Sequence, residues 1–213
     1  MQTDKIMVSA NGAGWNEALE EAAKFAAYVG LDKKAAMRVR LMTEEAISLI
    51  ESVAGDFAAE LRIESDKNCA VRLFLKAQTD MDFVKRKELI DVSTEKKNAA
   101  AKGILGKIRQ VIENCLYSVD EVSSLTTEYG GAPLMYGTMG MYETDPGMAM
   151  SSMNYMWSLG TYKDSVETAM DSDDAAKEAW DELEKSIIAS IADDVKVGVS
   201  GNTVELVIEK KNF

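Results

Sequence analysis

Residues 40–50, with the sequence RLMTEEAISLI, combine a helical apolar rhythm with a carboxylate that could take part in chemistry. Glu45 and Leu49 are four residues apart, so they share one face of a helix. A carboxylate there could orient or activate a nucleophile, whereas an aliphatic side chain offers no oxygen to a hard cation such as Mg²⁺. Ser48 and Ser52 lie near that face and could supply a hydroxyl. The alternative interpretation is that Glu45 is an ordinary helix glutamate without a chemical role.

The other residues that could hold a ligand lie further along the chain. Asp80 follows a predicted strand, and residues 85–109 carry eight bases against three acids. Two glycines and two lysines stand together in that stretch: Lys102, Gly103, Gly106 and Lys107. Such a group at a helix N-terminus could hold nucleotide phosphates. The alternative is a close helix-packing contact with solvated lysines beside it.

Composition excludes several classes of function. The chain has no histidine, which excludes His-based triads, His general bases and His-ligated metals. Cys69 and Cys115 have no CxxC spacing, which fits a reduced cytosol. No apolar run approaches the roughly 20 residues that cross a bilayer, and the first residues lack the pattern of a secretory signal. We therefore predict a cytoplasmic protein without a membrane partner.

The net charge of -12 is placed unevenly along the chain. Residues 1–118 hold 18 acids and 18 bases, whereas residues 119–213 hold 18 acids and 6 bases. An acidic protein with one basic segment is a poor partner for nucleic acid, which requires extended neutralisation of phosphates. The acidic C-terminal part instead favours a protein partner.

Hydrophobic periodicity predicts the elements that position these residues. The first part is predicted to form a strand, two helices and a hairpin, at residues 5–10, 15–28, 33–54, 57–64 and 69–76. Asp32 is placed to cap the second helix and Gly55 to end it. The apolar stripe of that helix is Ala35, Val39, Met42, Ala46, Leu49, Ile50 and Val53. Further helices are predicted up to about residue 91 and at residues 99–116.

The second part of the chain begins with a stretch that has no sustained period. Residues 119–171 are rich in Met, Gly and Tyr, and we predict a partly irregular insertion there. A helix from Ser172 to about residue 192 and a hairpin at residues 195–199 and 203–209 follow. The core face of that helix is predicted to be Trp180, Leu183, Ile187, Ile188 and Ile191. Residues 1–118 and 172–213 are thus predicted to form one α+β domain, a two-layer sandwich of a mixed or antiparallel sheet with helices on one face.

This order of elements resembles the histidine-kinase-like ATPases, the GHKL or Bergerat fold, and most closely their anti-sigma-factor serine kinase branch. The resemblance covers about residues 4–80 and 172–210, with the middle in place of the family's nucleotide lid. It implies that ATP or ADP binds with Mg²⁺, that Glu45 is catalytic and that Asp80 holds the adenine. It also implies that the phosphates lie near the glycines and lysines named above.

Three departures from the family pattern bear on its chemistry. Leu49 stands where the family has the asparagine that holds magnesium. The glycine of the family's Asp-x-Gly turn is missing after Asp80. The helix before the last hairpin begins at residues 171–174, DSDD, whose three acids repel phosphate.

We therefore expect a degenerate regulatory domain that acts through protein contacts, made by its acidic C-terminal part and its methionine-rich insertion. Two alternatives stay open. One is an active, Mg-ATP-dependent protein-serine kinase with an altered metal site. The other, more remote, is Cu(I) binding by the methionines of the insertion.

Overall fold

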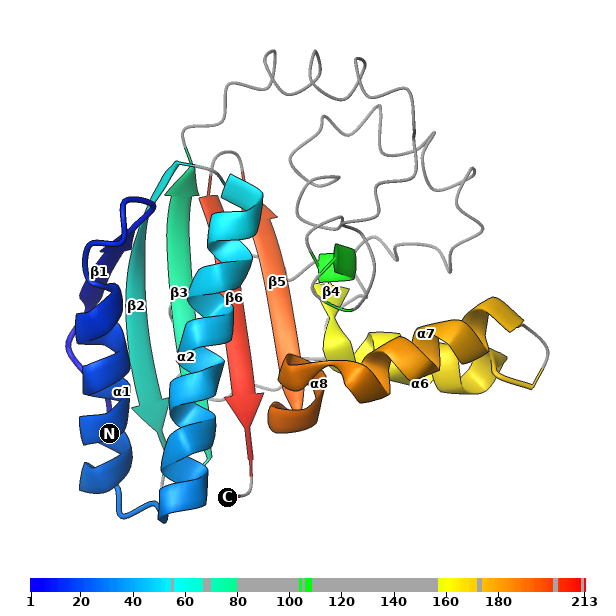
Figure 1. The fold of residues 1–213 in the computed structure, drawn as a ribbon, viewed down its shortest axis with the longest axis horizontal. Helices are drawn as coiled ribbons and strands as arrows, with labels where there is room; N and C mark the ends of the chain where they lie inside the picture. Colours follow the sequence, from blue (N-terminus) through cyan, green and yellow to red (C-terminus); the bar gives the residue numbers. More distant parts are fainter. Residues whose placement is uncertain are drawn as a thin grey trace.

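The computed structural model of the chain describes residues 1–54, 56–66, 70–79, 104, 106–108, 157–171, 174–200, 203–211 and 213. Its described part is an α+β fold built on a six-stranded sheet (Figure 1). The strands are β1 Ile6–Ser9, β2 Phe57–Ser65, β3 Val71–Thr79, β4 Trp157–Ser158, β5 Asp194–Ser200 and β6 Thr203–Lys210. The principal helices of the described part are α1 Trp15–Tyr28, α2 Lys33–Ala54, α6 Leu159–Ala169, α7 Asp174–Lys185 and α8 Ile187–Ile191.

The sheet has the order β1-β2-β3-β6-β5-β4, and every neighbouring pair is antiparallel. The two predicted hairpins, β2–β3 and β5–β6, are therefore joined in one sheet by pairing of β3 with β6. Leu75 of β3 lies opposite both Leu61 of β2 and Leu206 of β6. This pairing of distant segments places one continuous apolar surface across the centre of the sheet.

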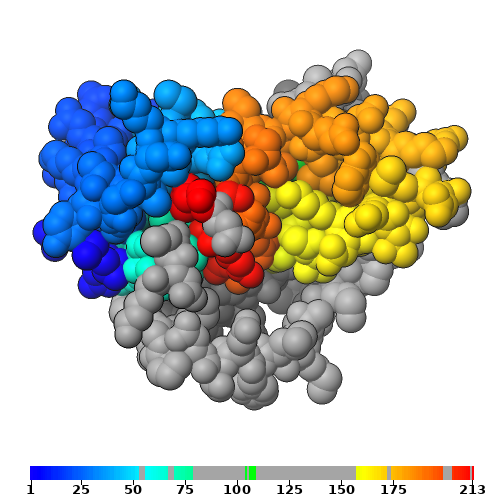
Figure 2. All heavy atoms as spheres, turned by 90° about the horizontal axis from the view of Figure 1, so that it is seen from below, coloured from blue at the N-terminus to red at the C-terminus, as the bar shows by residue number. Residues whose placement is uncertain are grey.

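Helices α1 and α2 cover one face of that sheet (Figure 1). Seen from below in Figure 2, they form a layer above the strands. The burial of β2 alternates, with Phe57, Ala59, Leu61 and Ile63 turned into the core. Such alternation is expected for a sheet with one covered face. The predicted α+β class, with an antiparallel sheet and helices packed on it, is confirmed.

The predicted start of α2 is also confirmed. The Asp32 Oδ1 accepts a hydrogen bond of 2.7 Å from the Ala35 backbone N–H, which satisfies one of the free amides of the first turn. Helix α1 begins differently, after Gly14 with a φ of 78°. A Cβ at Gly14 would overlap the backbone carbonyl oxygen of Met7, so this close approach of loop and strand requires glycine.

The prediction of one continuous helix from Ser172 to about residue 192 is wrong, because the chain forms two helices there, α7 and α8. They meet at Ser186, whose Oγ accepts a 3.4 Å hydrogen bond from the Ala189 backbone N–H and caps α8. A serine side chain that bonds to a nearby backbone amide competes with helix continuation. The predicted core position of Ile187 is consequently wrong: this side chain is 53% exposed, whereas Leu183, Ile188 and Ile191 are buried and Trp180 is half-buried.

The last part of the predicted insertion, residues 157–169, forms β4 and α6. Trp157 pairs with Val197 at the edge of the sheet, and Leu159 is fully buried. Asp194 holds the first turn of α6, since its Oδ1 accepts a hydrogen bond of 3.0 Å from the Gly160 N–H. Residues 119–156 and the helix predicted up to residue 91 lie outside the described residues, as does Ser172, so the domain boundaries stay a prediction.

Candidate functional site

Glu45 lies in the middle of α2, at the margin of its apolar stripe. Its side chain is half-buried, while the next residue, Ala46, is fully buried. Burial, with a smaller contribution from the negative charge of Glu44, raises the pKa of the Glu45 carboxyl above its ordinary value of 4.5. No hydrogen bond or ion pair joins this carboxylate to another described residue. The site therefore holds a partly desolvated carboxylate without a described cationic partner.

Leu49, one turn further along α2, belongs to the hydrophobic core. Its side chain is only 3% exposed and packs with Met42, Ala46 and Ile50 in the same cluster. The Ser52 hydroxyl donates a hydrogen bond of 2.7 Å to the Leu49 carbonyl oxygen, and so it is engaged by the helix backbone.

Neighbouring side chains do not replace the oxygen ligand that Leu49 lacks. Ser48 is exposed on the outer side of α2, away from the buried face. Within the described part of the chain, there is no group of three or more Cys, Asp or Glu residues that could hold a metal ion. Among the described residues, the part of α2 around Glu45 therefore shows no set of oxygen ligands for a cation.

The predicted phosphate-binding residues are described only in part. Gly106 and Lys107 are helical, and Gly106 is buried. The Lys107 Nζ lies 5.9 Å from the centroid of the Tyr162 ring of α6, within the range of a cation–π contact. Asp80, Lys102 and Gly103 lie outside the described residues.

Tyr162 joins Lys107 to the edge of the sheet. Its ring centroid is 6.0 Å from that of Trp157 in β4, and the two rings are tilted by 39°. Burial, followed by the negative charge of Glu182, raises the pKa of the Tyr162 hydroxyl. Helix α6 packs on β5, whereas α2 packs on β2, β3 and β6. The structure therefore places Lys107 and Glu45 on separate elements, with no described contact between them.

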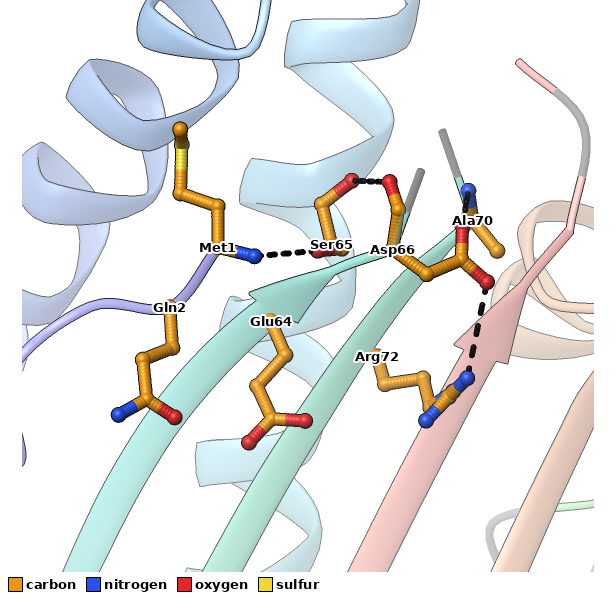
Figure 3. Close-up of a pocket in the computed structure, with 7 residues that line it drawn as sticks. All are labelled: Met1, Gln2, Glu64, Ser65, Asp66, Ala70 and Arg72. Carbon is orange, nitrogen blue, oxygen red and sulfur yellow. Dashed lines mark hydrogen bonds and ion pairs between the residues drawn. The ribbon is translucent and has the colours of Figure 1, made fainter. Parts of the chain in front are cut away.

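A pocket of about 280 Å³ lies at the β2–β3 turn, a place that the sequence did not single out (Figure 3). Its lining residues are Met1, Gln2, Glu64, Ser65, Asp66, Ala70 and Arg72. The Asp66 carboxylate accepts a hydrogen bond of 3.0 Å from the Ala70 N–H and lies 3.6 Å from the Arg72 guanidinium. Glu64 is paired with Arg62 at 2.8 Å. These charged side chains bond to the hairpin turn and to one another. We therefore interpret the pocket as part of the structure of the hairpin and not as a ligand site.

The sheet face opposite α1 and α2 carries a second group of charges that sequence reasoning missed. Lys76 pairs with Glu205 at 2.9 Å, and Lys196 pairs with Glu209 at 3.3 Å. Between these pairs on β6 lies Val207, which is buried. The available signal was the alternation of residues 203–210, TVELVIEK, in which an apolar residue falls between two acids on the same face. Paired charges around an apolar centre hold these strands in register.

Two further observations concern the chain as a whole. None of the described helices is both long enough and apolar enough to span a bilayer. Comparisons with protein-family models, curated proteins and solved structures gave no match to this chain. A functional proposal therefore depends on the residues and their geometry.

Proposed function

We propose that this chain is a regulatory α+β domain, a degenerate relative of the histidine-kinase-like ATPases, that acts through protein contacts and not through magnesium-dependent ATP chemistry. The observation that carries the proposal is the burial of Leu49 in the core. In the ATPase family that the sequence resembles, the residue at this position supplies an oxygen ligand to magnesium. Here it supplies aliphatic packing, and Mg²⁺ requires oxygen ligands in near-octahedral geometry.

The position of Glu45 supports the same proposal. Burial raises the pKa of this carboxyl, with a smaller contribution from the negative charge of Glu44, and no described side chain forms an ion pair with it. Glu45 thus lies at the margin of a core-facing stripe, one turn before the buried Leu49.

The charge of the C-terminal part supports action through protein contacts. Helix α7 carries five acids and two bases in twelve residues. Most of these acids are exposed, while its buried residues Ala176 and Leu183 face its own chain. An acidic helix held on the outside of a fold suits recognition of a basic protein surface.

Thermal unfolding with and without Mg-ATP tests the proposal. A ligand present at about 100 times its Kd stabilises the folded state by about 2.7 kcal/mol. For a chain of this size, that raises the Tm by about 5–10 °C. We expect no shift with Mg-ATP or Mg-ADP. A shift of that size which Glu45→Gln abolishes would overturn the proposal and favour the active kinase.

A further inference from the structure

The N-terminal half of α2 is the most basic described helix surface. Between residues 33 and 43 the helix carries four bases and no acid: Lys33, Lys34, Arg38 and Arg40. Lys33, Lys34 and Arg40 are exposed, and none of the three has a hydrogen bond or ion pair through its side chain with another described residue. Asp32, which precedes these bases, is engaged as the helix cap, and the exposed Glu44 follows one turn after Arg40.

Large apolar side chains are exposed beside these bases. Tyr28 at the end of α1 is 75% exposed, Met37 in α2 is 65% exposed and Ile187 in α8 is 53% exposed. Helices α1 and α2 are joined by a short turn, and α8 lies beside the N-terminal half of α2 (Figure 1). Tyr28 is the last residue of α1 and Met37 lies in the second turn of α2, so both lie toward the end of the helical layer at which these two helices are joined. Tyr, Met and Arg together are typical of protein interfaces.

Helix α7 provides the complementary charge on the same molecule. Asp174, Glu178, Asp181 and Glu184 are exposed along it. Trp180 is half-buried against the hydrophobic core, and its indole N–H donates a hydrogen bond of 3.1 Å to Glu184. The helix extends away from α2, on the far side of α8 (Figure 1). Within one chain, then, α7 and the basic half of α2 do not pack on each other.

We propose that the basic half of α2, with Tyr28 and Met37, docks on α7 of a second copy of this chain. Each copy carries both halves of the complementary pair, so one two-fold axis can form the contact twice, as in an isologous dimer. The Trp180 ring then meets the Tyr28 and Met37 side chains, while the acids of α7 meet the bases of α2. This inference rests on the proposed function, which assigns the acids of α7 to a protein contact, and it names the partner as a second copy of this chain.

Reciprocal charge reversal tests this contact in the full-length chain. Lys33→Glu with Arg40→Glu reverses the basic half, and Glu178→Lys with Asp181→Lys reverses the acidic half. Sedimentation equilibrium at about 0.15 M ionic strength, where the Debye length is about 8 Å, measures self-association. We expect each double variant to raise the dissociation constant about tenfold or more. Combining all four substitutions in one chain should restore association.

The control reverses one exposed charge on another element. Lys5→Glu, next to the edge strand β1, removes only the exposed pair with Glu60 at 2.7 Å, and it is compared with the single reversals Lys33→Glu and Glu178→Lys. This control should associate like the wild type, and all variants should retain the wild-type circular dichroism. A wild type that is monomeric at every concentration, double variants that associate unchanged, or a combined variant that stays dissociated would each overturn the inference.

Discussion

Replacing Leu49 with asparagine restores, in this chain, the residue that the resemblance places one turn after Glu45. If that position faced a working metal site, asparagine would be accommodated and would add magnesium binding. The structure instead places the side chain in the core, 3% exposed, among Met42, Ala46 and Ile50. We therefore expect Leu49→Asn to destabilise the fold and to add no metal affinity.

The magnitude follows from two contributions. Loss of a buried leucine side chain removes about 1.5–3 kcal/mol of transfer free energy. The buried amide, which finds no arranged partner in an apolar cluster, adds about 1–3 kcal/mol. The sum of about 2.5–6 kcal/mol is a large part of the roughly 5–15 kcal/mol that stabilises a typical domain.

Urea unfolding followed by circular dichroism measures this change, with m-values compared between variants. Leu49→Ala is the matched control for lost packing, expected to cost about 2–5 kcal/mol. Ser48→Asn places the same amide on the exposed side of α2 and should stay within about 0.5 kcal/mol of the wild type. A Leu49→Asn variant within about 1 kcal/mol of the wild type, beside a clearly destabilised Leu49→Ala, would refute the reasoning, as would new magnesium binding.

Two other substitutions test the loop and the electrostatics. Gly14→Ala should cost about 3 kcal/mol or more in urea unfolding, because its φ is positive and its Cβ would overlap a backbone carbonyl of β1. Gly12→Ala, with a φ of 84° and open space around it, should cost only about 1 kcal/mol; equal losses would contradict this. The pKa of Glu45 is raised in the folded state, so at pH values between the unfolded and the folded pKa the folded chain retains a proton that the unfolded chain has released. The free energy of unfolding therefore falls as the pH rises from about 4.5 through the folded pKa. Glu45→Gln should therefore be more stable than the wild type at neutral pH and equal to it at lower pH; a less stable variant at neutral pH would show that the carboxylate has a favourable partner.

Much of the fold was predictable because local pattern and tertiary packing agree. The stripe of α2 from Ala35 to Ile50 and the alternation of β2 each bury the residues that their periods select, and Asp32 caps α2 as expected. The sequence order alone did not determine that β3 pairs with β6, which depends on packing of distant segments. The break at Ser186 was missed because an apolar period of 3.6 continues across it, while the serine hydroxyl selects a cap. Strand β4 was missed because two residues are too few to show a period.

The candidate site was predictable only at the level of single positions. The helical pattern correctly placed Leu49 in the core, and the same pattern left Glu45 at its margin. Which side chains meet Glu45 depends on elements that are distant in sequence. The ring contact of Lys107 with Tyr162 likewise joins two segments whose spacing carries no local signal.

The central claim is that the face of α2 bearing Glu45 does not bind a divalent cation. Electron paramagnetic resonance of Mn²⁺–ATP, titrated with this protein, measures that binding directly, since Mn²⁺ takes the same oxygen ligands as Mg²⁺. The account predicts the spectrum of free Mn²⁺–ATP at every protein concentration. Loss of the free signal with wild-type protein, and its recovery with Glu45→Gln, would contradict the account.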